Sequence, residues 1–201
     1  MMHWFKRKKN YPSYVQDYLE RIQDEGFSTQ IIALDMETSS VDERKAKILS
    51  FGSITGDDQR IFPDTERHLF FMNDHEATDE NLIIHEILDD ENKSDFKDHL
   101  PEILQWIGNK KILGHFVQFD ISLINRELKK QGFPLLKNPS IDTLKLALKY
   151  DGVHDFSFVK KENYTLYSLC KRFEIDIFNT HDALEDAYLS FLVYHHLKQG
   201  N

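Results

Sequence analysis

The sequence has only one cysteine, Cys170, among its 201 residues. A single cysteine excludes an intramolecular disulfide and cannot form a thiolate zinc site alone, which suits a reducing compartment. The chain also lacks an uninterrupted apolar run close to the roughly 20 residues that span a bilayer. Basic residues between Met1 and Lys9 are not followed by an apolar segment, so no signal peptide is expected. We therefore expect a cytoplasmic protein with no membrane partner.

Positive charge is scarce too, because 34 acidic residues outnumber 25 basic ones and the formal net charge is -9. This balance argues against a protein that coats duplex nucleic acid through a broad basic surface. It leaves room for an enzyme that binds the end of a strand, where bound metal ions supply the positive charge. The length and the 40% hydrophobic content fit a soluble globular protein with one sizeable core.

The stretch from Ile31 to Thr38 places two carboxylates, Asp35 and Glu37, directly after four apolar residues. Side chains alternate across a strand, so both acids share one face. Because both faces begin apolar, the stretch is typical of a central strand covered on both sides. Two poorly solvated acids on one face repel each other, and a divalent cation between them is the simplest remedy. A strand that merely ends in solvent is the alternative.

The remaining patterns indicate one α/β domain, residues 29–201, behind an N-terminal helical extension, residues 1–28. Strands near Ile48 to Thr55 and His68 to Met72 would form an antiparallel meander with the opening strand. After that, helical periodicity alternates with short strands, which predicts a mixed sheet flanked by helices. The expected later strands are 111–114 and 140–142, and the expected helices are 78–88, 95–107, 117–130, 143–150, 165–173 and 182–198.

Two further acids lie on the apolar faces of predicted helices. Asp120 shares a stripe with apolar residues at spacings of three, four and eight, and Asp186 shares one with Ala183, Val193 and Leu197. One such acid is most often a capped or salt-bridged core residue, because an uncompensated buried carboxylate is unfavourable. Two of them, together with the acidic strand, favour a shared metal site.

His181 stands five residues before Asp186. On one helix the two side chains would be about 140 degrees apart and could not face the same ligand. The geometry works if His181 precedes the helix on a loop. A histidine at the mouth of a carboxylate site suits a general base better than a metal ligand.

Three motifs in order now resemble a known family, namely Asp35-x-Glu37-Thr38, Gly114-His115-x-x-x-Phe119-Asp120 and His181-Asp182-Ala183-Leu184-Glu185-Asp186-Ala187. The chain is similar to the DEDDh 3′-5′ exonucleases, the DnaQ-like proofreading enzymes with an RNase H-like fold. The resemblance runs from about Ile31 to Leu197, and residues 142–144 and 166–175 match secondary patterns of the family. It implies an RNase H-like mixed sheet, with three antiparallel strands followed by parallel ones, flanked by α-helices.

The resemblance also implies roles for individual residues. Asp35, Glu37, Asp120 and Asp186 would be the four acidic metal residues, and His181 would be the catalytic base. Two oxygen-ligated ions, Mg²⁺ or Mn²⁺, fit such a site. In the two-metal scheme one ion prepares the attacking water, the histidine takes its proton, and the second ion stabilises the leaving 3′ oxygen.

Three positions are implied to contact substrate, namely Thr38, His85 and Phe116. The segment Ile84-His85-Glu86-Ile87 resembles the family's His-Gly-Ile segment, with Glu86 in place of the glycine. Phe116 stands where many members have asparagine, and Ser39-Ser40 replaces the common Thr-Gly. These departures affect substrate preference and leave the five catalytic positions unchanged.

Three functions stay open on this resemblance. The first is a metal-dependent 3′-5′ exonuclease that releases nucleoside 5′-monophosphates from single-stranded DNA. An exoribonuclease or oligoribonuclease would use the same residues, because the shape of the pocket decides contacts to the 2′-hydroxyl. A non-catalytic module that binds a DNA polymerase has no physical need for four converging carboxylates. The implied partners are therefore a nucleic acid 3′ end and, as an alternative to a stand-alone enzyme, a DNA polymerase.

Overall fold

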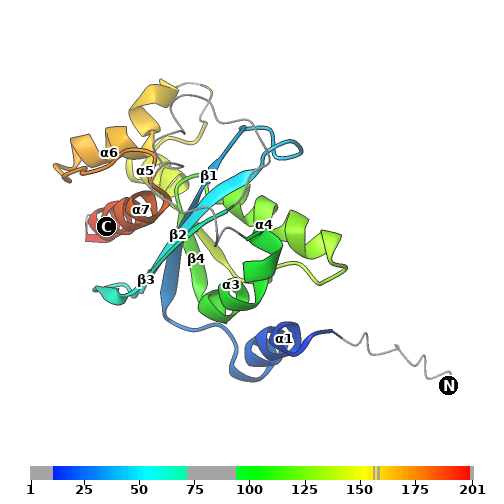
Figure 1. Cartoon of the computed structure of the whole chain (residues 1–201). Coiled ribbons are helices and arrows are strands. Elements are labelled where there is room, and N and C mark those ends of the chain that lie inside the picture. The colour runs from blue at the N-terminus through cyan, green and yellow to red at the C-terminus, as the bar shows by residue number, and fades with distance from the viewer. Residues whose placement is uncertain (1–10, 72–93, 156, 158, 200–201) are drawn as a thin grey trace, which may run out of the picture.

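The computed structural model describes residues 11–71, 94–155, 157 and 159–199. In this part of the chain five strands form one sheet of order β3-β2-β1-β4-β5 (Figure 1). The strands are β1 (Ile31–Thr38), β2 (Ile48–Gly56), β3 (Ile61–Phe70), β4 (Lys111–Gly114) and β5 (Ser140–Asp142). β1, β2 and β3 pair antiparallel, whereas β4 pairs parallel with both β1 and β5. This topology confirms the predicted fold class.

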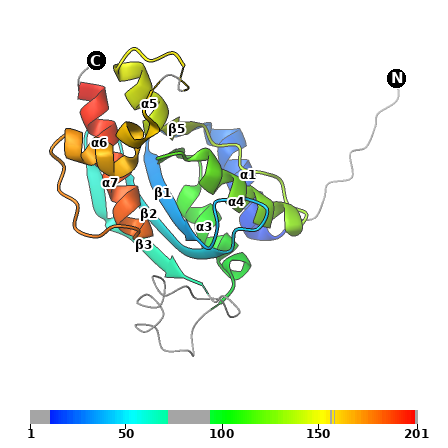
Figure 2. The ribbon, with the colours of Figure 1, turned by 90° about the horizontal axis from the view of Figure 1, so that it is seen from above.

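Helices cover both faces of the sheet. They are α1 (Ser13–Glu25), α3 (Leu100–Ile107), α4 (Gln118–Lys130), α5 (Thr143–Tyr150), α6 (Leu166–Arg172) and α7 (Ala183–Gln199), with short 3-10 turns η2 (Phe96–His99) and η4 (Lys161–Tyr164). Both ribbon views show α1, α3 and α4 on one side of β1 and α5, α6 and α7 on the other (Figures 1 and 2). No helix among the described residues has the length and apolar character needed to cross a membrane.

Alternation along β1 divides the core between these two layers. Ile32 and Leu34 pack in the cluster that includes buried residues of α1, α3 and α4. Ile31 and Ala33 face the other way and pack against Ala187 and other residues of α7. The strand is therefore covered on both faces, as its two apolar faces predicted.

The edge strand β3 begins earlier than the sequence predicted. The prediction put it at 68–72, but Ile61 already pairs with Gly56. Asp57 forms the turn between them, because its side chain accepts hydrogen bonds from the backbone amides of Gln59 and Arg60. Pro63, which lacks a backbone donor, is tolerated because β3 lies at the edge of the sheet.

The predicted helix 95–107 is divided into η2 and α3. Pro101 lies in the first turn of α3, where its missing N–H has no intrahelical partner to lose. The predicted helix 78–88 lies outside the described residues. α1 begins after Pro12 and ends at Gly26, which has a φ of 69°, and buries Val15 and Tyr18 in the core. The division of the chain at residue 28 stays a prediction.

Two glycines of β2 let α7 lie directly on the sheet. A Cβ at Gly52 would be 2.2 Å from the carbonyl carbon of Ala183 and 2.2 Å from the backbone nitrogen of Leu184. A Cβ at Gly56 would be 2.7 Å from the ring of Phe191. Since Gly52 has no side chain, the backbone at the start of α7 lies directly on β2, next to the residue that pairs with Asp35 of β1.

Candidate active site

Three carboxylates converge at the carboxyl end of β1. One oxygen each from Asp35, Glu37 and Asp186 lies within 4.8 Å of the others. Asp35 pairs across the ladder with Gly52, the residue against which α7 packs. The close approach of α7 therefore carries Asp186 to the two acids of the strand.

Asp120 lies beside this group on α4 but is not one of the three. Its side chain is 3% exposed, in the first turn of the helix. Burial raises the pKa of Asp120 well above its usual value, while the backbone amides of Asp120 and Met36 lower it. The interaction with Met36 puts the carboxylate next to β1. The structure thus brings three of the four predicted acids into one cluster and puts the fourth against the same strand.

The clustered acids raise one another's pKa values. For Asp35, burial raises the pKa well above the ordinary value, and the charges of Asp120 and Asp186 raise it further. Burial raises the pKa of Asp186 to about 7, although a hydrogen bond from Tyr167 opposes this. Burial also raises the pKa of Glu37. Such a set of hard oxygen donors with excess negative charge fits a divalent cation such as Mg²⁺ or Mn²⁺.

His181 lies on the loop just before α7, where the sequence predicted it. The residue is exposed and has a φ of 59°, an unusual value for a residue other than glycine. Its charge lowers the pKa values of both Glu37 and Asp186, so the imidazole lies near these two carboxylates. An exposed proton acceptor beside an acidic site is an arrangement suited to general base catalysis.

Tyr167 is a site residue that sequence reasoning missed. Its hydroxyl lies 2.9 and 2.8 Å from the two carboxylate oxygens of Asp186, to which it donates. The same oxygen accepts a hydrogen bond of 2.6 Å from the backbone N–H of His181. The Tyr167 ring also meets the imidazole edge to face, with centroids 5.6 Å apart. Only its place within the matched pattern 166–175 could have drawn attention to it.

Two of the three predicted substrate contacts, Thr38 and Phe116, lie within the described residues. Thr38 ends β1, and its hydroxyl donates to the carbonyl of Ser40 at 3.1 Å. Phe116 follows β4 with 57% of its surface exposed. His85 lies outside the described residues. Asp142, within a matched pattern, is structural: its Oδ1 accepts from the backbone amides of Leu144 at 3.0 Å and Phe116 at 3.2 Å.

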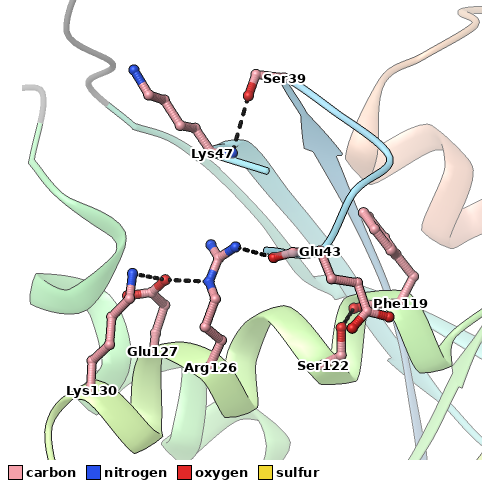
Figure 3. Close-up of polar contacts among 8 residues, drawn as sticks. All are labelled: Ser39, Glu43, Lys47, Phe119, Ser122, Arg126, Glu127 and Lys130. Carbon is pink, nitrogen blue, oxygen red and sulfur yellow. Dashed lines mark hydrogen bonds and ion pairs between the residues drawn. The ribbon is translucent and has the colours of Figure 1, made fainter. Parts of the chain in front are cut away.

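The loop between β1 and β2 is fastened to α4 (Figure 3). Arg126 donates to the carbonyl of Glu43 at 2.5 Å and to Glu127 at 3.0 Å, and Lys130 binds the same Glu127 oxygen at 2.9 Å. Ser39 accepts a hydrogen bond from the backbone N–H of Lys47, which closes the loop. Beside this loop lies a cavity of about 480 Å³ with six basic residues in its lining, Arg44, Lys45, Lys47, Lys97, Arg126 and Lys130. Two acids also line it: Asp95 pairs with Lys97, and Glu127 pairs with Arg126 and Lys130.

A mixed sheet of this order, with acids from β1, α4 and α7 at one edge, defines the RNase H-like class of α/β proteins. Within that class, a model of the RNase T exonuclease family matches residues 32–194. The chain belongs to this exonuclease family. The match confirms the resemblance to DnaQ-like, DEDDh exonucleases.

Curated relatives and solved structures agree with this assignment. The chain is 34% identical over 184 residues to the DNA polymerase III subunit epsilon of Rickettsia conorii, covering 86% of this chain and 75% of that protein. The chain is also 28% identical to a PolC-type DNA polymerase III from Halalkalibacterium halodurans. This match covers 79% of the present chain but only 11% of the polymerase.

Two solved structures share the fold. Escherichia coli exonuclease I in complex with a dT13 oligonucleotide has a TM-score of 0.66 and 17% identity, over 85% of this chain and 41% of that chain. The nuclease domain of 3′hExo, a DEDDh family member bound to rAMP, has a TM-score of 0.64 and 12% identity, over 85% and 92% of the two chains.

Proposed function

We propose that this protein is a metal-dependent 3′-5′ exonuclease that removes nucleoside 5′-monophosphates from the 3′ end of single-stranded DNA. The observation that carries the proposal is the convergence of Asp35, Glu37 and Asp186 within 4.8 Å. Three carboxylates at this separation are electrostatically unfavourable without a cation. Since the chain belongs to an exonuclease family, a hydrolytic metal site is the function that explains the cluster.

Each of the five predicted catalytic residues has a task in this proposal, and so does Tyr167. Asp35, Glu37, Asp120 and Asp186 hold two divalent ions, Mg²⁺ or Mn²⁺. When bound, these ions supply Lewis-acid chemistry and positive charge at the scissile phosphate. His181 takes a proton from the attacking water, which its exposed position on the loop permits. Tyr167 keeps Asp186 and the histidine loop in a fixed relationship through its hydroxyl.

The choice of polymer rests on the comparisons. Exonuclease I was solved with a dT13 oligonucleotide, and the epsilon subunit belongs to a DNA polymerase. Both support DNA as the substrate, and the second supports a DNA polymerase as partner. Thr38, His85 and Phe116 are the proposed contacts to the strand end. The cavity beside the β1–β2 loop has six basic and two acidic residues in its lining, and this excess of positive charge supports binding of a phosphate backbone.

An exoribonuclease is the second candidate. It is favoured by the 3′hExo nuclease domain, a DEDDh family member with rAMP bound, whose fold the chain shares. The acidic site can serve both polymers, because the 2′-hydroxyl is distinguished by contacts around the sugar.

A time course on matched DNA and RNA oligonucleotides tests the proposal. Substrates labelled at the 5′ end should shorten one nucleotide at a time in Mg²⁺, and DNA should be degraded faster than RNA. EDTA and the Asp186→Asn variant should each abolish the reaction. Release of a 5′-terminal label at the first step, or full activity of Asp186→Asn, would contradict it.

A further inference from the structure

The turn between β4 and α4 is fixed on both sides of Phe116. The Phe116 backbone N–H donates to Asp142 at 3.2 Å, and its carbonyl accepts from the backbone N–H of Phe119 at 3.0 Å. Val117, the next residue, is completely buried. The main chain at Phe116 is therefore held in place by contacts that do not involve its own side chain.

The side chain of Phe116 is poorly suited to this backbone. Its φ is 62°, in the left-handed region that bulky residues rarely adopt and that glycine or asparagine accepts more readily. Burial does not compensate, because 57% of the residue is exposed. Neither the backbone nor the core thus explains an aromatic ring here, and strained residues of this kind cluster at functional sites.

The position of Phe116 relative to the acids suggests the function of its ring. β4 runs parallel to β1, so the carboxyl ends of both strands lie at the same edge of the sheet. Phe116 follows β4 at that edge, four residues before Asp120. A Cβ at Gly114 would be 2.9 Å from the carbonyl oxygen of Leu34, so the end of β4 lies against β1 one residue before Asp35. Phe116 therefore lies, with its ring exposed, at the edge of the sheet where the acids cluster.

We propose that Phe116 is a stacking platform for a nucleobase near the 3′ end of the bound strand. The inference rests on the proposed function and specifies how the site recognises its substrate. Stacking on an aromatic ring depends on the face of the base and not on phosphate charge. It is therefore an effective contact beside carboxylates that repel phosphates, in a chain with a net charge of -9.

Binding measurements on variants of the full chain test the stacking. The parent is Asp186→Asn, in which cleavage is blocked, and the probe is a 5′-labelled oligodeoxynucleotide of about 12 nucleotides followed by anisotropy in Mg²⁺. Phe116→Leu and Phe116→Asn in this parent should each weaken binding by about tenfold, and Phe116→Trp should retain the parent's affinity. Phe27→Leu is the matched control, because Phe27 is also exposed but precedes the amino end of β1.

An abasic residue moved through the last positions of the oligonucleotide identifies the stacked base. When the abasic residue occupies the position of the stacked base, the parent should bind more weakly. The parent and Phe116→Leu should then bind this oligonucleotide with equal affinity. Thermal unfolding gives a second readout: Phe116→Asn should raise the Tm by about 2–4 °C, because it relieves the backbone conformation. A structural role for the ring would instead lower the Tm.

The outcomes separate stacking from the proposed function. If Phe116→Leu and Phe116→Asn bind the oligonucleotide as tightly as the parent does, the stacking proposal is wrong. The exposed ring would then have to contact something other than a base. A difference that persists at every abasic position, or a lower Tm in Phe116→Asn, would also overturn it. Cleavage by the unsubstituted chain is measured separately. If the unsubstituted chain does not cleave but the variants show the expected affinities, the exonuclease proposal is wrong and the stacking proposal stands. If the chain cleaves but the variants do not show those affinities, the stacking proposal is wrong and the exonuclease proposal stands.

Discussion

The hydroxyl of Tyr167 lies 2.9 and 2.8 Å from the two carboxylate oxygens of Asp186. Tyr167 belongs to α6 and Asp186 to α7, so the contact joins two helices at the site. Because the same hydroxyl also accepts the backbone N–H of His181, one side chain sets the positions of a proposed metal ligand and the proposed base.

The Tyr167→Phe variant removes this hydroxyl and keeps the ring. We expect kcat to fall by about tenfold with little change in KM, because a hydrogen bond to a charged group stabilises its position by about 1.5–3 kcal/mol. Without metal, the pKa of Asp186 should rise further above about 7, because the lost hydrogen bond lowered it. Steady-state kinetics and NMR titration of the carboxyl group measure the two effects.

Tyr194→Phe is the matched control for Tyr167→Phe. Tyr194 also donates its hydroxyl to an aspartate, Asp58, but it lies near the other end of α7. Its loss should change stability and leave kcat as it was. Equal kcat in the Tyr167 variant and the unsubstituted chain would refute the positioning role.

Gly52→Ala tests how α7 reaches the strand. The added methyl group would lie 2.2 Å from two backbone atoms of the helix, at Ala183 and Leu184. Because backbone atoms cannot move aside as a side chain can, we expect the free energy of unfolding in urea to fall by about 3 kcal/mol. Gly132→Ala is the comparison, since a Cβ there meets no atom within 4 Å and only the φ of 73° opposes it. If Gly52→Ala lowers the free energy of unfolding no more than Gly132→Ala does, the close packing of α7 on β2 is contradicted.

The acidic cluster should make the metal-free protein less stable as pH rises. Burial raises the folded-state pKa of Asp186 from 3.8 to about 7, so the folded state binds more protons between these values. The contribution of this group to stability is therefore lost as pH rises from about 4 to about 7. One pKa unit corresponds to about 1.4 kcal/mol, which gives an upper limit of about 4 kcal/mol.

Urea unfolding in EDTA at about pH 5 and pH 8 measures this dependence. Asp186→Asn should be more stable than the unsubstituted chain at the higher pH, by about 1–3 kcal/mol, and its pH slope should be smaller. Mg²⁺ should remove much of the difference. A variant that is less stable than the unsubstituted chain at the higher pH would show that the cluster is not strained.

His181→Ala should lose rate without losing metal. We expect kcat to fall by about 100-fold or more, because a general base contributes about that much. His154→Ala, which removes an exposed histidine of a loop, should keep the full rate. Loss of metal binding in His181→Ala would make the histidine a ligand and not a base.

The sequence predicted those parts of the site that depend on local periodicity. Alternation in β1 put Asp35 and Glu37 on one face, and the 3.6-residue repeat put Asp120 and Asp186 on buried helical faces. The loop position of His181 followed from the angle between it and Asp186. These inferences need only the geometry of a single element.

The contacts that sequence reasoning missed come from packing between elements. Tyr167 reaches Asp186 only because α6 packs beside α7, and no spacing in the sequence records that contact. Gly52 resembles any strand glycine until α7 lies against it. The early start of β3 was also missed, since Pro63 is accommodated only because the strand lies at the edge of the sheet.

The central claim is that the converging carboxylates hold divalent cations. Calorimetric titration of Mn²⁺ into the metal-free full chain tests it without relying on any nucleic acid substrate. The unsubstituted protein should bind Mn²⁺, and Asp35→Asn should bind it at least tenfold more weakly while keeping the same fold by circular dichroism. Equal Mn²⁺ affinity in the two proteins, or no binding by either, would contradict the account.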